Sequence, residues 1–253
     1  MPDSISIITA SFNAGDTIAD CLKSVASQTA CQHLIIDGAS TDGTLAFLES
    51  YSGHPITWRS APDRGVYDAM NQGIAMATGE IIGILNADDC YATDDVLATV
   101  AAAFAIPGVD ACYGDLCYVD AERLAKITRY WRAGSFSPRA FYWGWMPPHP
   151  TFFVRRQVYE RHGGFNLALS SAADYELMLR FLIRHQVKVV YIPKILVHMR
   201  QGGISNRSLA NRLRANRNDR RAWAVNGLTP LPWTFLAKPL RKVGQWWQKP
   251  DLY

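Results

Sequence analysis

The sequence predicts an α/β fold in which a mostly parallel sheet is flanked by helices. Short apolar runs alternate with amphipathic segments through residues 5–105, which is typical of consecutive β-α-β units. The run at 81–85 is apolar throughout, as expected for a strand buried on both faces of such a sheet. Acids follow two of these runs, at the strand ends where ligands bind in open α/β sheets.

The first half of the chain contains predicted strands and helices in strict alternation. Apolar runs predict strands at 5–10, 33–37, 56–60 and 81–85. Helical spacing of apolar residues predicts helices at 18–25, 44–51, 66–77 and 94–105. The first strand is not followed by G-x-G-x-x-G, and the chain lacks a P-loop, which argues against a dehydrogenase and a P-loop nucleotidase.

Beyond residue 105 the pattern changes to short strands and irregular segments. We expect antiparallel strands at 109–113, 116–119 and 127–131, and further strands at 187–192 and 195–200. The segment 174–185 has the apolar spacing of an amphipathic helix. Aromatic residues stand beside prolines at 141–150, which suggests a wall or lid, with a plug in the core as the alternative.

Composition indicates a globular intracellular protein. Hydrophobic residues make up 49% of the chain, enough for a sizeable core. The five cysteines are scattered and form no C-x-x-C pair, which favours reduced thiols over a disulfide framework or a zinc site. Because we find neither a signal-peptide pattern nor an apolar stretch of membrane-spanning length, we expect a cytoplasmic location.

The positive charge is concentrated in the C-terminal tail, residues 207–253. Residues 1–206 carry 16 Lys and Arg against 20 Asp and Glu, whereas the tail carries 10 against 2. In the tail, cations are interleaved with the large apolar residues Trp233, Phe235, Leu236, Trp246 and Trp247. This mixture is typical of helices that lie on an anionic membrane surface, here the inner face of the cell membrane. The alternatives are a tail packed on the domain and a contact between subunits of a homo-oligomer.

Two adjacent acids, Asp88 and Asp89, follow the apolar run at 81–85. Adjacent carboxylates repel each other, so we expect a positive partner beside them. Mg²⁺ or Mn²⁺ is the simplest candidate, because these cations prefer oxygen ligands and often link a few carboxylates to a phosphate. The alternative is that the two acids only open a turn.

Taken in order, these segments resemble the family 2 glycosyltransferases of the GT-A fold, in particular bacterial members that build cell-surface polysaccharides. The similarity covers about residues 4–206. It is carried in the first half by T-A-S-F-N at 9–13, I-D-G-A-S-T-D-G-T at 36–44, D-R-G-V-Y-D-A-M-N-Q-G-I at 63–74, A-T-G-E at 77–80 and L-N-A-D-D at 85–89. In the second half it is carried by G-G-F at 163–165, A-A-D-Y-E-L-M-L-R at 172–180 and M-R-Q-G-G-I-S at 199–205.

The resemblance implies a nucleotide-sugar donor bound along the strand ends. The base would lie at Asp37, beside Thr9 and Ser11, and the ribose and diphosphate would lie beneath the segment 63–71. The implied donor contacts there are Arg64, Asp68, Asn71, Asn86, Ala87 and Asp88. UDP is the expected nucleotide, with GDP and dTDP as alternatives. Asp37 could instead hold a turn, and Arg64 could be part of a solvated charge pair.

The resemblance also assigns the chemistry. Asp88 and Asp89 would bind the metal, with His198 completing the shell, although Asn86 stands where the family often has the first acid of D-x-D. Asp174 would be the general base of an inverting transfer to a saccharide or lipid-linked acceptor, with Glu176 in reserve. The alternatives are a structural role for His198 and a helix-capping role for Asp174.

The resemblance implies three parts: a nucleotide-binding half at 1–105, an acceptor-binding half at 106–206, and the tail. Two other functions are considered. A sugar nucleotidylyltransferase would normally carry a Gly-rich, Arg-containing loop after the first strand, where this chain has residues 11–15, S-F-N-A-G. A nucleic-acid-binding protein acting through the basic tail is not expected, because the first 206 residues are net acidic and contain no recognisable base-stacking module.

Overall fold

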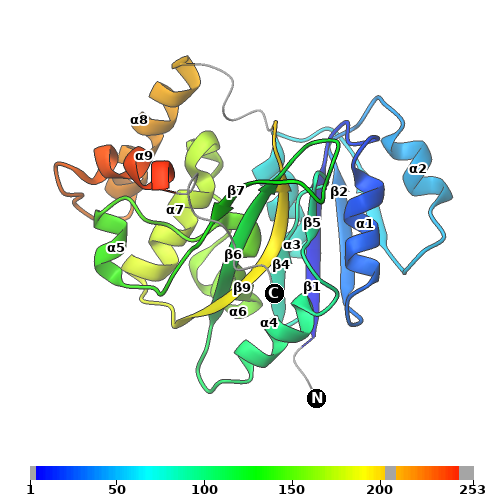
Figure 1. Cartoon of the computed structure of the whole chain (residues 1–253), viewed down its shortest axis with the longest axis horizontal. Helices are drawn as coiled ribbons and strands as arrows, with labels where there is room; N and C mark the ends of the chain where they lie inside the picture. Colours follow the sequence, from blue (N-terminus) through cyan, green and yellow to red (C-terminus); the bar gives the residue numbers. More distant parts are fainter. Residues whose placement is uncertain (1–3, 203–208, 245–253) are drawn as a thin grey trace.

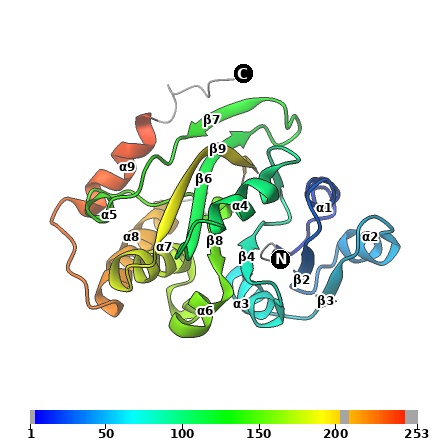
Figure 2. The same cartoon turned by 90° about the horizontal axis from the view of Figure 1, so that it is seen from below.

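The computed structural model describes residues 4–202 and 209–244. Within these residues the strands form one sheet in the order β3-β2-β1-β4-β8-β6-β9-β5, with β7 paired to β6 (Figures 1 and 2). The strands are β1 (Ile5–Ser11), β2 (Gln32–Asp37), β3 (Thr57–Ser60), β4 (Ile81–Ile84), β5 (Asp89–Tyr91), β6 (Ala111–Val119), β7 (Ile127–Trp131), β8 (Phe153–Arg155) and β9 (Val189–Arg200).

Helices cover both faces of this sheet. They are α1 (Ile18–Ala26), α2 (Thr44–Ser50), α3 (Val66–Met76), α4 (Val96–Phe104), α5 (Pro138–Tyr142), α6 (Arg156–His162), α7 (Ala173–Leu179), α8 (Leu209–Val225) and α9 (Thr234–Gly244). Short helical turns are η1 (His149–Thr151), η2 (Leu167–Ala172) and the π-helical turn η3 (Arg180–Arg184). The α/β class and the mixed sheet are as predicted.

The first half folds as its hydrophobic pattern predicts. Strands β3, β2, β1 and β4 pair in parallel. Alternate residues of β1 belong to different cores: Ile8 packs in the core that includes residues of α3 and α7, whereas Ile7 packs in the core that includes residues of α1 and α4. Parallel pairing places the carboxyl ends of these strands at one edge of the sheet, which we call the rim.

The second half has fewer and longer strands than the sequence pattern indicated. Segments 109–113 and 116–119 were expected as two strands but form the single strand β6, and 187–192 and 195–200 form the single strand β9. These two strands pair in parallel, and the expected breaks become a shift of register near Gly114 and Asp115. The expected antiparallel pairing holds for β6 and β7.

The described part of the tail packs on the domain. Helix α8 contacts η2 and α7, and its Trp223 is fully buried with the indole N–H donating to the Tyr175 hydroxyl at 2.9 Å. Lys238 of α9 forms an ion pair with Asp219 of α8 at 2.7 Å. Trp246, Trp247 and Lys249, which the sequence linked to a membrane surface, lie outside the described residues.

Candidate active site

The rim brings together residues that are far apart in the sequence. Ser11 and Asp37 end neighbouring strands and are direct partners in the register of β1 and β2. The turn that carries Ala87 and Asp88 is placed beside them, because the Ala87 N–H donates to the Ala10 carbonyl of β1 at 3.3 Å. The predicted gathering of these segments at one edge is therefore present.

Asp37 is 1% exposed, and its carboxylate is largely occupied within the protein. It accepts hydrogen bonds from the Ser40 N–H at 2.8 Å, from the Ser40 hydroxyl at 2.5 Å, and from the Ser60 hydroxyl at 2.7 Å. Three of about four acceptor positions of a carboxylate are thus taken. In this structure Asp37 fixes the loop after β2, which is the turn-holding role considered as its alternative.

The Thr9 hydroxyl is enclosed within the protein. Its side chain is fully buried, and its hydroxyl lies 3.0 Å from His33 Nε2. The Thr9 hydroxyl also lies 3.8 Å from Cys21 Sγ of α1. The contact between Thr9 and His33 is therefore on the face of the sheet that α1 covers. The structure therefore does not bring the Thr9 hydroxyl to a donor nucleotide, and we exclude Thr9 from the donor contacts.

Buried oxygen atoms without hydrogen-bond partners mark the rim among the described residues. They include Ser11 Oγ, Asn86 Oδ1 and Asp89 Oδ1. The Asn86 amide donates to Asp89 Oδ2 at 3.3 Å, so the two side chains are joined while one oxygen of each stays unpaired. Unsatisfied buried polar atoms are rare in native proteins, and several in one place favour a bound polar group.

Asp88 and Asp89 lie in an environment that opposes their ionisation. Burial, and next the neighbouring charge of Asp88, raise the pKa of Asp89 well above its usual value. Burial also raises the pKa of Asp88, which keeps partial exposure. The guanidinium of Arg200 lowers both pKa values in part, so a cation does accompany the two acids.

The side chains present at the rim fit a metal ion that is held mainly by the oxygens of the bound diphosphate. Within residues 4–202 and 209–244, no group of three or more His, Cys, Asp and Glu side chains could hold a metal, so Asp88, Asp89 and His198 are not assembled as a closed shell. His198 lies in β9 opposite Cys90 of β5. Mg²⁺ and Mn²⁺ sites often use one or two carboxylates with the oxygens of a diphosphate, and the partly exposed Asp88 beside the unpaired rim oxygens suits that type.

The N-terminus of α3 forms the other side of the site. A cavity of about 170 Å³ is lined by Arg64, Gly65, Val66, Tyr67 and Leu167. The Arg64 side chain is 76% exposed and pairs with Asp68 at 2.8 Å, so this solvated pair, considered as the alternative, is present. The Asp68 carboxylate is occupied by Arg64. The Arg64 guanidinium is exposed and can still contact an anion.

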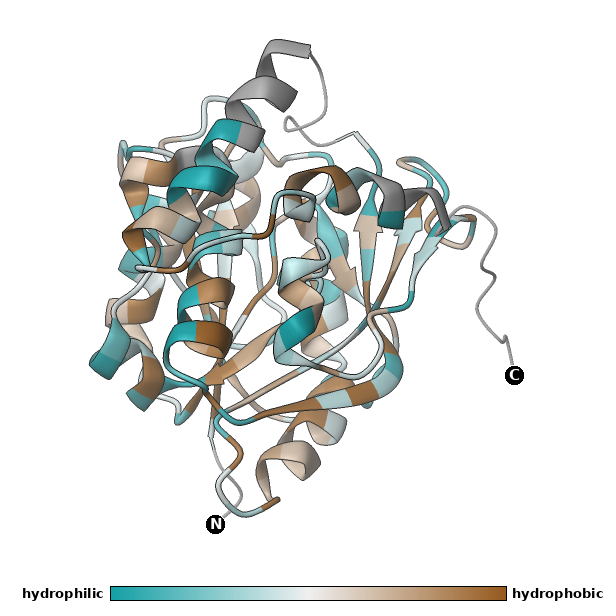
Figure 3. Cartoon of the chain, turned by 90° about the vertical axis from the view of Figure 1, so that its left-hand side faces the viewer, coloured by the Kyte–Doolittle hydropathy of each residue, from teal (hydrophilic) through white to brown (hydrophobic). Residues whose placement is uncertain are grey.

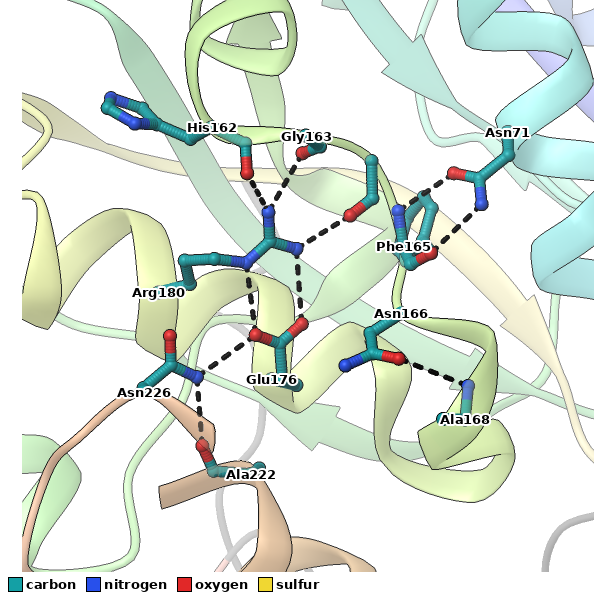
Figure 4. Close-up of polar contacts among 11 residues, drawn as sticks. Asn71, His162, Gly163, Phe165, Asn166, Ala168, Glu176, Arg180, Ala222 and Asn226 are labelled. Atoms are coloured by element: carbon teal, nitrogen blue, oxygen red, sulfur yellow. Dashed lines mark hydrogen bonds and ion pairs between the residues drawn. The ribbon is translucent and has the colours of Figure 1, made fainter. Parts of the chain in front are cut away.

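Asn71 is used to hold a loop. Its amide oxygen accepts from the Phe165 N–H at 2.7 Å, and its amide nitrogen donates to the Phe165 carbonyl at 2.9 Å (Figure 4). A Cβ atom at Gly164 would lie 2.3 Å from the same amide oxygen, so this position needs glycine. The predicted contact of Asn71 with the ribose or diphosphate is therefore not supported.

Asp174 lies in the first turn of α7 and faces the start of α3. The pKa of the Tyr67 hydroxyl is raised by burial, then by the charge of Asp174 and by hydrogen bonding to its carboxylate. Burial lowers the pKa of His149, and the charge of Asp174 partly opposes this effect. The Phe165 ring packs against both Tyr67 and His149, at centroid distances of 5.3 and 5.6 Å. Tyr67 and His149 thus lie near Asp174, and Phe165 packs against both of them.

Glu176 is fully engaged elsewhere. It is 2% exposed and forms a two-pronged ion pair with Arg180, at 3.0 and 3.1 Å, and it also accepts from the Asn226 amide at 3.0 Å (Figure 4). Arg180 in turn donates to the carbonyls of the loop 162–164. Glu176 is therefore not available as the reserve base and instead fixes α7 and this loop.

Three residues of the site were missed in the sequence. Tyr67 and His149 flank Asp174, and Arg200 accompanies Asp88 and Asp89. Tyr67 and Arg200 lie inside the motifs at 63–74 and 199–205, and His149 lies in the aromatic segment expected as a wall. Only their position inside those motifs marked them, because their partners come from distant segments.

The chain is similar to known glycosyltransferases. A model of the family described as "Glycosyl transferase family 2" matches residues 6–163. An uncharacterized glycosyltransferase of Mycobacterium tuberculosis is 35% identical over 180 residues, which cover 70% of this chain and 68% of that protein.

Two solved structures show the same fold. S. aureus TarS, in complex with UDP-GlcNAc, has a TM-score of 0.67 at 17% identity, covering 88% of this chain and 65% of that one. The mannosyltransferase PcManGT from Pyrobaculum calidifontis, in complex with GDP-Man and Mn²⁺, has a TM-score of 0.65 at 21% identity, covering 95% and 68%. This chain thus spans slightly less than two thirds of the TarS chain.

Proposed function

This chain belongs to glycosyl transferase family 2, and we propose that it transfers a sugar from a nucleoside diphosphate donor to an acceptor hydroxyl with inversion at the anomeric carbon. The observation that carries the proposal is the junction between α3 and the segment that leads into α7, where Phe165 packs on Tyr67 at 5.3 Å and is held by Asn71. It joins α3, which begins beside the exposed Arg64 and the cavity, to the helix with the expected general base. A donor phosphate and an acceptor hydroxyl can thus meet between them.

In the proposed reaction the acceptor oxygen bonds to the anomeric carbon while its proton passes to the carboxylate of Asp174. The bond from that carbon to the diphosphate oxygen breaks, and the nucleoside diphosphate leaves with the electron pair. One base suffices for a single displacement, unlike the carboxylate pair of a retaining glycosidase. Tyr67 and His149 lie near the base, and the Tyr67 hydroxyl would orient its carboxylate. Arg64 stabilises the negative charge of the leaving group.

We propose that Asp88 holds Mn²⁺ or Mg²⁺ at the donor diphosphate. The metal would supply Lewis-acid stabilisation of the leaving group. The support is the partly exposed Asp88 carboxylate among unpaired rim oxygens, and the Mn²⁺ in the PcManGT complex. Asp89 is fully buried and Asn86 is bonded to it, so these two residues position the turn that carries Asp88.

UDP is the first candidate for the donor nucleotide, and GDP and dTDP are the next. TarS and PcManGT are solved with UDP-GlcNAc and GDP-Man, so this fold accommodates both uridine and guanosine donors. For the acceptor we propose a saccharide, in particular a lipid-linked one used for cell-surface polysaccharides. This proposal rests on the resemblance of the motifs to those of bacterial polysaccharide enzymes.

Calorimetric titration tests the donor proposal. The protein is titrated with UDP, GDP and dTDP, each with and without Mn²⁺, and we expect one nucleotide to bind with an affinity that Mn²⁺ increases. Arg64→Gln should weaken that binding, and Arg161→Gln, a control in an exposed side-chain pair on α6, should not. If none of the three nucleotides bound in the presence of Mn²⁺, the proposed function would be wrong.

A further inference from the structure

Two exposed tryptophan side chains lie side by side on the surface formed by α5 and α9. Trp143 follows α5 and is 52% exposed, and Trp233 precedes α9 and is 42% exposed. Their ring centroids are 5.5 Å apart although the residues are separated by ninety positions. Leu236, in the first turn of α9, is 69% exposed. We call Trp143, Trp233 and Leu236 the indole face; Figure 3 looks onto the side of the molecule that carries α5 and α9.

Buried contacts beneath the indole face hold the two segments together. The Thr234 hydroxyl is buried, donates to the Tyr142 carbonyl at 2.8 Å and accepts from the Leu231 N–H at 3.0 Å. At Gly144, which has a φ of 72°, an added Cβ would lie 2.4 Å from the Lys238 backbone nitrogen. The backbone after Trp143 therefore packs directly on α9. These contacts fix the segments next to Trp143 and Trp233. The two indoles are therefore exposed on a well-packed part of the protein.

The helices next to the indole face carry exposed cations. Arg139 of α5, Arg241 of α9, and Arg220 and Arg221 of α8 are exposed, and Arg220 also stacks on the Phe235 ring at 4.8 Å. The segments 132–147 and 220–244 contain no Asp or Glu. The face is thus apolar at its centre, and the charged residues of the segments 132–147 and 220–244 are all Lys or Arg.

We propose that the indole face docks on an anionic lipid bilayer. Tryptophan favours the interface between headgroups and acyl chains, where its ring is apolar and its N–H stays wet. Arg side chains near that interface are attracted to anionic headgroups. Within the described residues no helix is long and apolar enough to span a bilayer.

A second copy of the chain fits this face less well. In a two-fold contact the same patch meets itself, so the cations around the indoles would face identical cations. The docking surface also differs from the tail as the sequence suggested it, because Trp223 of α8 is buried and bonded to Tyr175. Lys238 of α9 lies over the Tyr175 ring at 3.9 Å, so the helix that carries Leu236 contacts α7.

Co-sedimentation with vesicles tests this inference without requiring any transfer reaction, so its outcome is separate from that of the proposed function. The full chain is mixed with vesicles of phosphatidylcholine alone or with an equal part of phosphatidylglycerol. We expect binding to the anionic vesicles, weakened by added salt. The double variant Trp143→Ala, Trp233→Ala should bind about tenfold or more weakly, and Arg139→Gln with Arg241→Gln should remove most of the salt dependence.

The control is Ile106→Ala, another exposed apolar residue, placed after α4. It should bind as the parent protein does. Circular dichroism and thermal melts verify that each variant is folded. If the double tryptophan variant does not fold, Leu236→Asn is tested in its place. Absence of binding to anionic vesicles by the parent protein, or equal binding by a folded indole variant, would overturn the inference. So would light scattering that shows a dimer lost in the indole variants, because the occupant would then be a second copy.

Discussion

Asn71 of α3 holds Phe165 by both of its backbone polar groups, through hydrogen bonds of 2.7 and 2.9 Å. Ninety-four positions separate the two residues, so this clamp joins the first half of the chain to the loop before α7. Phe165 in turn packs on Tyr67 and His149, the residues beside Asp174. The position of Asp174 therefore depends on Asn71, which the family resemblance had assigned to the nucleotide-sugar donor.

Asn71→Ala should lower the free energy of unfolding by about 1–3 kcal/mol, because it leaves a partly buried N–H and carbonyl of Phe165 without partners. The midpoint of urea unfolding measures this loss. Gln157→Ala, which removes an exposed side-chain contact with Arg161, is the control and should change stability little. If Asn71→Ala were as stable as the control, the clamp would have no structural role.

Glu176→Gln should destabilise the protein by about 3–5 kcal/mol, because it leaves the largely buried Arg180 without its counter-charge. Glu160→Gln breaks the comparable pair with Arg156 in α6, four residues apart but exposed, and should cost less than about 1 kcal/mol. Denaturant unfolding of both variants gives the comparison. Where folded, Glu176→Gln should keep most of its turnover. A loss of the ~10²–10⁴-fold expected for a missing base would return Glu176 to the chemistry.

Replacing both Asp88 and Asp89 by Ala should abolish the increase in nucleotide affinity that Mn²⁺ produces. The reason is that Asp88 supplies the protein carboxylate of the proposed metal site and Asp89 positions its turn. Calorimetry with UDP or GDP, with and without Mn²⁺, measures this difference directly. Asp94→Ala, an exposed acid nearby, should retain it. An unchanged Mn²⁺ effect in the double variant would exclude metal binding by these acids.

His33 should make the protein less stable as the pH falls. Burial, and next the neighbouring His54, lower the pKa of His33 to about 3 from an ordinary value near 6.5. Between these values the unfolded chain binds a proton that the folded protein does not, so the free energy of unfolding decreases on acidification. The decrease is at most about 1.4 kcal/mol per pH unit, or ~2 kcal/mol from pH 6.5 to 5.

Denaturant unfolding at several pH values, for the parent protein and His33→Gln, measures this contribution. The variant should show a shallower pH dependence below pH 6.5 by about one proton. Identical slopes for the two proteins would mean that His33 is protonated in the folded state as readily as in the unfolded chain.

Local periodicity was sufficient to predict the first half of the fold. Strands β1, β2 and β4 are rich in isoleucine, and the intervening helices have apolar stripes, so the alternation is encoded within each segment. Parallel pairing then placed Ser11, Asp37 and the turn after β4 at one rim. By contrast, β8 has only three residues, and its pairing with β4 and β6 makes it a strand.

The roles of individual polar residues were harder to predict. Asp37 and Asn71 were assigned to the donor because both lie in the expected motifs, yet Ser60 and Phe165 occupy them, and those partners come from other segments. Thr9 shares a strand face with Ser11, so strand alternation alone could not show that its hydroxyl would contact His33 instead of the rim. Glu176 depends on Asn226, fifty residues later, which local sequence does not reveal.

The direct test of the central claim is the rate at which Asp174→Asn cleaves a bound nucleotide-sugar. The parent protein and the variant are each saturated with a nucleotide-sugar of the nucleotide that calorimetry selects, water serves as the acceptor, and release of the nucleoside diphosphate is followed in a single turnover. The account predicts that the variant binds the donor with an affinity close to that of the parent, while its cleavage slows by ~10²–10⁴-fold. Cleavage at the parental rate by a folded, donor-bound Asp174→Asn protein would contradict it.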